Sequence, residues 1–265
     1  MWVKMDEVLA SFMEWTAWGM ERPPSYGAFH LIWTAVALLV CVIFAWKLRN
    51  VSEKANRWIL LSIGIFLILC ELYKQLFYYY HIGSRSYQWW IFPFQLCSVP
   101  MYLCIIAPLL RPGKLQRGMY HFMLTFNLLG GIAALAEPSG LTHEYWTLTL
   151  HAFIWHSLLI FIGLYLGFSH RTKARWQDYT LACLTFLGLA AIAFGINLAL
   201  QNVSEGTINM FFVGPKNSSL VVFKDISEHY GWYISTLLYL PTVCIGALAV
   251  FLPFHLAKKN QCGNP

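Results

Sequence analysis

The sequence predicts an all-α, polytopic membrane protein with seven transmembrane helices, and three observations support this fold class. Of its 265 residues, 58% are hydrophobic and only 11% are charged, whereas about a quarter of the residues of a soluble domain are charged. Seven apolar stretches reach roughly 20 residues, the length at which a helix crosses about 30 Å of hydrocarbon. None alternates with the period of a barrel strand, so helices are the form that satisfies their backbone hydrogen bonds in lipid.

The seven predicted spans form one transmembrane domain over residues 25–259. They cover residues 27–46, 58–79, 91–110, 119–137, 147–168, 179–200 and 231–257. Residues 1–24 precede them and contain early acids without a long apolar centre, so they do not resemble a cleavable signal peptide. Their aromatic residues suit the membrane boundary and predict an amphipathic interfacial helix, ended by a Pro-Pro pair; these residues are Trp2, Phe12, Trp15 and Trp18.

The only long connection is the segment 201–230 between the last two predicted spans. It contains a strand-like patch at 219–223, which predicts a short hairpin or a lid. It also carries two glycosylation triplets, at Asn202 and Asn217.

The basic residues predict the orientation, because Lys and Arg next to a span tend to stay on the cytoplasmic side. Seven passes place the termini on opposite sides. Twelve of the 18 basic residues fall on one side: Lys47, Arg49, Lys54, Arg57, Arg111, Lys114, Arg117, Arg171, Lys173, Arg175, Lys258 and Lys259. We therefore expect an N-terminus outside, a cytoplasmic C-terminus and an outer 201–230 loop.

The composition also limits the partners. It lacks the strongly basic or repetitive character of nucleic-acid-binding or disordered chains, so we expect membrane lipids and no nucleic acid as partners. The seven cysteines lie in predicted spans or the cytoplasmic tail, which excludes a disulfide framework, and no spacing is typical of a metal site. No cofactor or metal is expected, and the oligomeric state is left open.

Polar side chains gather at one depth within the predicted spans. Ionisable groups in a bilayer are costly and therefore indicate a functional site. At a rise of about 1.5 Å per residue they lie roughly 6–14 Å below the outer boundary or in the same outer third; they are His30, Glu71, Lys74, Gln95, Cys97, His151, His156 and Asn197. We expect them to surround a pocket open to the outer side. The alternatives are a self-neutralising Glu71–Lys74 pair that fastens its helix to a neighbour, and histidines that make ordinary interhelical hydrogen bonds.

Cys97 differs from the other cysteines, which we interpret as small hydrophobic residues. Pro93 and Pro100 flank it, and Pro100 cannot donate to the carbonyl of Leu96. The backbone there is expected to be kinked, with free carbonyls lining a cavity.

These residue types are suited to acyl transfer. A thiolate at Cys97 is the nucleophile, and a nearby His accepts its proton. His151 matches Cys97 better in depth, while His156 lies about 140° around the helix from His151. Lys74 or free amides would stabilise an oxyanion, and Glu71 would orient a His or balance Lys74.

At these residues the chain resembles the YwaF-type family of bacterial integral membrane proteins. The resemblance rests on Glu71-x-x-Lys74, the segment from Pro93 to Ser98, and the pair His151 and His156. That family is distantly similar to animal membrane phospholipid acyltransferases that use a Cys and a His. The resemblance implies a multi-pass protein of a bacterial plasma membrane, a phospholipid acyl donor, Cys97 as nucleophile and His156, with His151 second, as base.

Two other functions remain open. A transporter or receptor would use the same outward-facing pocket for a small amphiphile or lipid without catalysis, and Glu71 and Lys74 would then couple protons. A structural role in assembly with partner subunits would use small residues such as Gly130 and Gly131 for packing.

Overall fold

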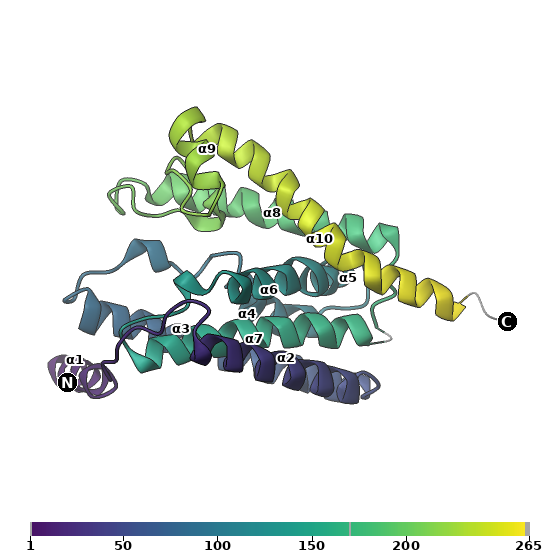
Figure 1. The fold of residues 1–265 in the computed structure, drawn as a ribbon, viewed down its shortest axis with the longest axis horizontal. Coiled ribbons are helices and arrows are strands. Elements are labelled where there is room, and N and C mark those ends of the chain that lie inside the picture. Colours follow the sequence, from purple (N-terminus) through teal and green to yellow (C-terminus); the bar gives the residue numbers. More distant parts are fainter. Residues whose placement is uncertain (1, 170, 263–265) are drawn as a thin grey trace.

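The computed structural model describes residues 2–169 and 171–262. Within them the chain is all-α, as predicted, and the one pairing of extended backbone is a bridge between Gly19 and Tyr145. The α-helices are α1 (Trp2–Trp15), α2 (Ala28–Leu48), α3 (Glu53–Phe77), α4 (Val99–Ile106), α5 (Lys114–Phe122), α6 (Leu128–Ala136), α7 (Trp146–Phe168), α8 (Trp176–Leu200), α9 (Phe223–Tyr230) and α10 (Trp232–Cys262). Figure 1 shows that most of them run along one direction, with the two termini at opposite ends of the molecule.

Six helical segments are long and apolar enough to cross a membrane. Two are extended by π-helical turns: η1 (Tyr78–Ile82) continues α3, and η4 (Met123–Asn127) joins α5 to α6. The six segments are Ala28–Leu48, Glu53–Ile82, Lys114–Ala136, Trp146–Phe168, Trp176–Leu200 and Trp232–Lys259. They correspond to six of the seven predicted spans.

The prediction of a seventh full-length span over residues 91–110 was wrong. In the second half of this predicted span, the short apolar stretch Val99–Leu109 is helical. Residues 92–98, in its first half, are irregular. The reason is the proline pair: Pro93 lies in the irregular part, and Pro100 stands in the first turn of α4, where its missing N–H breaks no helical bond. The chain still runs along the length of α3 here, since Ile91 lies beside Gln75 near the end of α3, and Pro108 and Leu110 lie beside Glu53 at its start.

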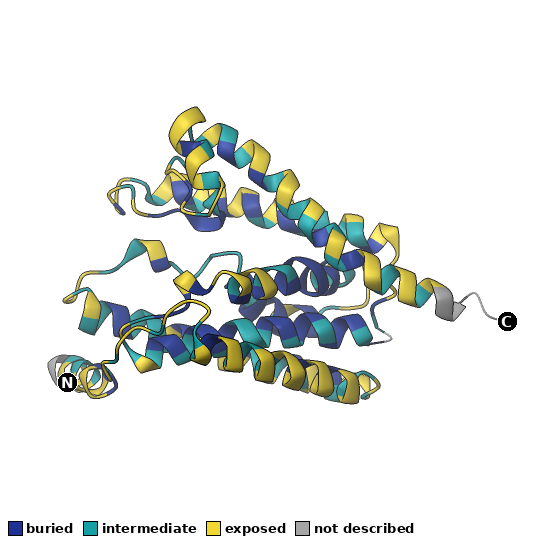
Figure 2. Ribbon diagram, in the orientation of Figure 1, coloured by how far each residue is buried: buried dark blue, intermediate teal, exposed yellow. Residues whose placement is uncertain are grey.

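Helix α7 lies at the centre of the bundle and packs against α2, α3, α6 and η4. Half of its apolar span is buried, against 17% for α2, and Figure 2 shows α7 mostly dark blue and teal, α2 largely yellow, and α10 a mixture of yellow and teal with little dark blue. The exposed side chains of α2 include Leu31, Ile32 and Val36. Such a continuous apolar face is costly in water and is the expected lipid-facing surface of a span.

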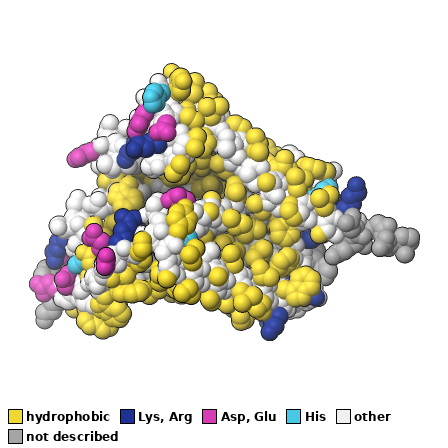
Figure 3. All heavy atoms as spheres, viewed as in Figure 1, with side chains coloured by type: hydrophobic (Ala, Val, Ile, Leu, Met, Phe, Trp, Pro, Cys, Tyr) yellow, Lys and Arg dark blue, Asp and Glu magenta, His cyan; other side chains and the backbone are white. Residues whose placement is uncertain are grey.

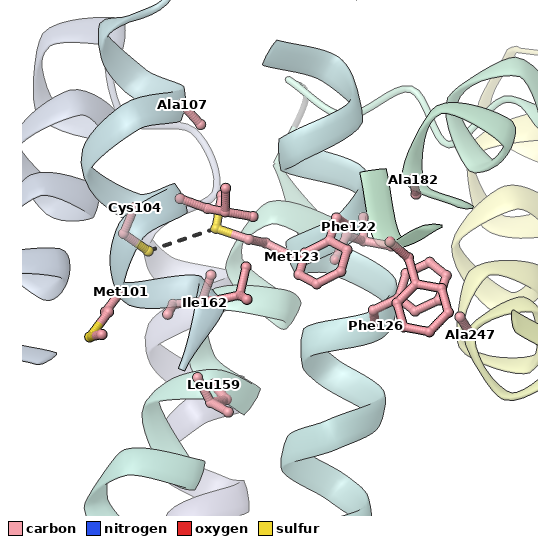
Figure 4. Packing of buried hydrophobic residues seen from close by; sticks show 14 of the residues in the cluster. Met101, Cys104, Ala107, Phe122, Met123, Phe126, Leu159, Ile162, Ala182 and Ala247 are labelled. Atoms are coloured by element: carbon pink, nitrogen blue, oxygen red, sulfur yellow. Dashed lines mark hydrogen bonds between the residues drawn. The ribbon is translucent and has the colours of Figure 1, made fainter. Parts of the chain in front are cut away.

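Side chains of α4, α5, η4 and α7 fill the core, as Figure 4 shows. The Cys104 Sγ lies 3.7 Å from the Met123 Sδ, and the rings of Phe122 and Phe126 stack at 5.3 Å. Close helix approach depends on glycine: a Cβ at Gly131 would lie 2.8 Å from the Ile160 Cγ1. Packing through small residues replaces the hydrophobic driving force that is absent in lipid.

The N-terminal segment forms helix α1, which is fastened to η1. The Asp6 carboxylate accepts a hydrogen bond from the Tyr80 hydroxyl at 2.6 Å and pairs with Arg85 at 2.7 Å, while Met13 is 2% exposed. The opposite face exposes Phe12 and Trp15, and the side chain of Trp2 lies outside the described part of the chain. The placement of this helix at a membrane boundary, like the orientation of the whole chain, stays a prediction.

The hairpin considered for segment 201–230 is absent. Residues 219–222 are irregular and end in a turn, and Phe223 begins helix α9. The β-branched patch is too short to find a partner strand, and it serves as the entry to α9, which packs on α10.

Candidate functional site

A cavity of about 420 Å³ lies at the end of the bundle that also carries α1 and α9. Its wall comes from the end of α3 with η1, the irregular segment before α4, the α6–α7 connection, the first half of α7 and the 201–222 loop. The polar and aromatic side chains used below are Lys74, Gln95, Cys97, Ser98, His143, His151, Trp155, His156, Asn209 and Lys216. Five sequence-derived candidates thus share one cavity: Lys74, Gln95, Cys97, His151 and His156.

The irregular backbone around Cys97 is held by side chains instead of by a helix. The indole N–H of Trp155 donates to the Cys97 carbonyl at 2.9 Å, and the Tyr102 hydroxyl donates to the Pro93 carbonyl at 2.7 Å. Gln75 donates to the Ile91 carbonyl at 2.7 Å. Side chains therefore satisfy three carbonyls of this segment, those of Ile91, Pro93 and Cys97, which stabilises the broken segment between the helices.

Helix α7 supplies both imidazoles of the cavity. The Nδ1 of His156 lies 2.8 Å from the Ala152 carbonyl, one turn earlier. Since a carbonyl only accepts, Nδ1 carries the proton and Nε2 has the lone pair that a general base needs. His151 stacks on Trp155 at 5.4 Å, and its Nε2 is buried without a hydrogen-bond partner among the described residues.

A buried ion pair supports the cavity from α3. Glu71 is 5% exposed, and both of its oxygens lie 2.9 Å from the Lys74 Nζ. Gln75 donates to the same carboxylate at 2.6 Å. Lys74 lines the cavity, whereas Glu71 is not among the lining residues. Glu71 and Lys74 thus form the predicted ion pair, and the Lys74 ammonium also faces the cavity.

Two amides fasten the 201–222 loop over the cavity. Asn197, fully buried, donates to the Met210 carbonyl at 3.0 Å and accepts from the Met210 N–H at 2.7 Å. The Gln95 side chain accepts from the Phe211 N–H at 3.3 Å and donates to the Asn209 carbonyl at 3.4 Å. The loop thus lines the cavity and is held there by side chains, while its action as a lid stays a prediction.

Besides Glu71, two further candidates, His30 and Asn197, lie outside the cavity lining. His30 is 3% exposed, and its Nε2 lies 2.8 Å from the Leu135 carbonyl, so it joins α2 to α6. Asn197 holds the loop and does not reach the lining. Depth alone placed both with the site, because a depth estimate contains no information about which way a helix faces.

Several lining residues were missed by sequence reasoning. Trp155 was not identified as a candidate, although its indole donor suits a free carbonyl. The connections between the spans supply His143, Asn209 and Lys216. Polar residues are common in connections, so their type and position alone did not indicate a site. Burial and the charge of Arg22 lower the pKa of His143, so its ring is neutral at neutral pH.

The site offers a thiol, two imidazoles and an ammonium. In the described ranges 2–169 and 171–262, no group of three or more His, Cys, Asp or Glu side chains is arranged to hold a metal ion. These groups are suited to nucleophilic and general acid–base chemistry.

Comparison with known families corrects the assignment made from the motifs. The YwaF-type assignment was wrong, because the matching family model is that of the TMEM164 family, over residues 25–251. A few Glu, Lys, Cys and His positions are not enough to identify a family of polytopic proteins. Searches of curated proteins and of solved structures find no match. The match covers most of the chain, which is therefore a multi-pass membrane protein and belongs to the TMEM164 family.

Proposed function

We propose that this protein is a lipid acyltransferase or transacylase in which Cys97 carries the acyl group. The observation that carries the proposal is the meeting of Cys97, His151, His156 and Lys74 in one cavity, although they come from three different segments. The cavity also presents apolar side chains such as Leu141 and Leu148, which fit the acyl chain of a membrane lipid.

The first half-reaction transfers an acyl group from a phospholipid ester to Cys97. The His156 Nε2 accepts the thiol proton, and the thiolate attacks the ester carbonyl to form the carbon–sulfur bond. The carbon–oxygen bond to the glycerol then breaks, and the leaving oxygen takes the proton from His156. The second half-reaction reverses these steps with the hydroxyl of a lysolipid acceptor, so atoms and protons balance without a further reagent.

His156 is assigned as the base because its Nδ1 is already committed to the Ala152 carbonyl. This hydrogen bond fixes both the tautomer and the ring, which is what a proton acceptor at Nε2 requires. His151 is the second candidate, and its contact with Trp155 places it beside the residue that holds the Cys97 carbonyl.

Lys74 is assigned to stabilise the oxyanion. Two of its ammonium donors face the oxygens of Glu71, which leaves a third N–H for a group inside the cavity. A fixed donor of this kind stabilises developing charge strongly in a water-poor site.

The test is capture of the acyl group during turnover. Purified protein is incubated with a phospholipid and a lysolipid acceptor at neutral pH with hydroxylamine present, and fatty hydroxamate is measured by mass spectrometry. We expect hydroxamate from the wild type and none from Cys97→Ser. Cys70→Ser is the matched control, since Cys70 is partly exposed on α3 outside the cavity.

Capture during turnover also detects a thioester that is too short-lived to accumulate. Equal hydroxamate from Cys97→Ser and wild type would refute the acyl-enzyme. Lipid binding without any Cys97-dependent hydroxamate would favour the alternative of a receptor or transporter for an amphiphile.

A further inference from the structure

A second cavity, of about 980 Å³, lies at the opposite end of the molecule from Cys97. It is enclosed by the end of α2, the α7–α8 connection and the last turns of α10. The distribution of basic residues predicts that this end is cytoplasmic. The cavity takes no part in the proposed acyl transfer and needs an explanation of its own.

The wall of this cavity is strongly basic. It contains five cationic side chains, Arg49, Lys173, Arg175, Lys258 and Lys259, and no acidic residue is among its described lining residues. Figure 3 shows Lys and Arg side chains at this end of the molecule. These cationic side chains repel one another and together attract an anion. Their repulsion is offset when the anion binds.

The connection that carries two of these charges is held in place. The Lys258 Nζ donates to the Ser169 carbonyl at 2.9 Å, to the Thr172 hydroxyl at 3.0 Å and to the Thr172 carbonyl. The Nδ1 of His255 lies 2.8 Å from the carbonyl of Ala174, which adopts a left-handed φ of 48°. Lys258 is thereby saturated and acts as a fixed charge, while the exposed ammonium of Lys173 is presented next to it.

The ligand has an apolar part as well as an anionic one. The rings of Trp46 and Phe168 lie 5.6 Å apart, and those of Phe168 and Phe254 lie 6.0 Å apart, so the three form a continuous apolar wall. The Arg49 guanidinium lies 3.9 Å from the centre of the Trp46 ring and marks the boundary between this wall and the charged rim. A soluble phosphate would leave the aromatic wall uncovered, whereas a phospholipid would cover both surfaces.

We propose that this basic cavity binds the phosphate headgroup of an anionic phospholipid, with the lipid chains against the aromatic wall. Its position at the end of membrane-spanning helices is where such headgroups lie. Arg49, Lys173 and Lys259 are the side chains that contact the phosphate, and Lys258 supplies a fixed charge behind them. Arg175 is partly neutralised by Asp178, 3.3 Å away.

The experiment is a lipid titration of the detergent-solubilised full chain, read by native mass spectrometry. Phosphatidylglycerol is compared with phosphatidylcholine, and inorganic phosphate is added as a soluble competitor. The variant is K173Q/K259Q, and the matched control is R111Q/K114Q. All four side chains are exposed, and Arg111 and Lys114 lie outside the cavity lining.

We expect phosphatidylglycerol to bind more tightly than phosphatidylcholine. The double variant K173Q/K259Q should weaken its binding about 25-fold, which corresponds to about fivefold for each removed charge. The control variant should change binding by less than about twofold. An equal loss in both variants would overturn the proposal in favour of general surface charge. Equal affinity for the two lipids, or displacement by inorganic phosphate at concentrations comparable to the lipid, would also overturn it.

Discussion

Trp155→Phe tests how the cavity keeps its shape around Cys97. The change removes one donor, the indole N–H that lies 2.9 Å from the Cys97 carbonyl. It retains an aromatic ring that can still stack on His151. Trp155 is 4% exposed, so water does not replace the lost donor.

The magnitude follows from the orphaned carbonyl. An interhelical hydrogen bond in a membrane protein contributes about 0.6 kcal/mol on average, and a buried acceptor without a partner costs about 1–3 kcal/mol. We therefore expect Trp155→Phe to lower the free energy of unfolding by about 1–3 kcal/mol. Since Cys97 has no helix to hold it, acyl transfer should fall by a larger factor than stability alone explains.

The assay is unfolding in detergent followed by circular dichroism, together with hydroxamate capture on the folded protein. Trp18→Phe is the matched control, because the Trp18 indole donates to the Trp15 carbonyl at 2.8 Å on the exposed surface. There water replaces the donor, and a change within about 0.5 kcal/mol is expected. If Trp155→Phe were as stable and as active as the wild type, side-chain support of the broken segment would be refuted.

Three further predictions concern the loop, the pH dependence and the helix packing. Asn197→Leu should free the covering loop, because it leaves the N–H and the carbonyl of Met210 without partners. Limited proteolysis within residues 201–222 should then be at least tenfold faster than in the wild type. Asn202→Leu, at an exposed position, is the control. Burial and the charge of Arg22 lower the pKa of His143 in the folded state. The stability that the neutral ring contributes is therefore complete above about pH 6.5 and is lost as the pH falls toward the folded-state pKa. In His143→Gln this part of the pH dependence of the free energy of unfolding should disappear. Gly131→Ala should lower the free energy of unfolding by about 1–3 kcal/mol, because the new Cβ would lie 2.8 Å from the Ile160 side chain. Gly130→Ala adds a Cβ into open space, so it should be neutral or slightly stabilising in the same unfolding assay.

Each of these predictions has a result that would contradict it. Equal cleavage of Asn197→Leu and Asn202→Leu would mean that other contacts hold the loop. An unchanged pH dependence in His143→Gln would mean that another group titrates in its place. Equal stability of the two glycine variants would mean that α6 can move away from α7 at little cost.

The sequence predicted the apolar helices well because hydrophobicity and length suffice for a span. It failed at residues 91–110, where the composition is equally apolar but Pro93 and Pro100 divide the segment. The effect of a proline on the local backbone was predicted, since it depends only on neighbouring residues. Its effect on the length of the span depends on α3 and η4, which pack on the short helix and were not visible in the sequence.

The site was predicted in part for a similar reason. Lys74, Cys97 and His151 share the cavity because residues at one depth in a bundle can meet. Depth does not give the direction in which a helix faces, so His30 and Asn197 were grouped with the site although each binds a backbone carbonyl elsewhere. One donor that stabilises the irregular backbone, the indole of Trp155, lies 58 positions from Cys97 in the sequence, and such a pair depends on the tertiary fold.

Peptide mapping is the most direct test of whether Cys97 accepts an acyl group with His156 as the base. Full-length protein is incubated with phospholipid alone, so that no acceptor removes the acyl group, and is then digested at acidic pH and analysed by tandem mass spectrometry. We predict a fatty-acyl mass on the Cys97 peptide that neutral hydroxylamine removes. In His156→Ala it should form at least about a hundredfold more slowly. If the Cys97 peptide stays unmodified under conditions in which the protein transfers acyl chains, Cys97 is not the residue that carries the acyl group.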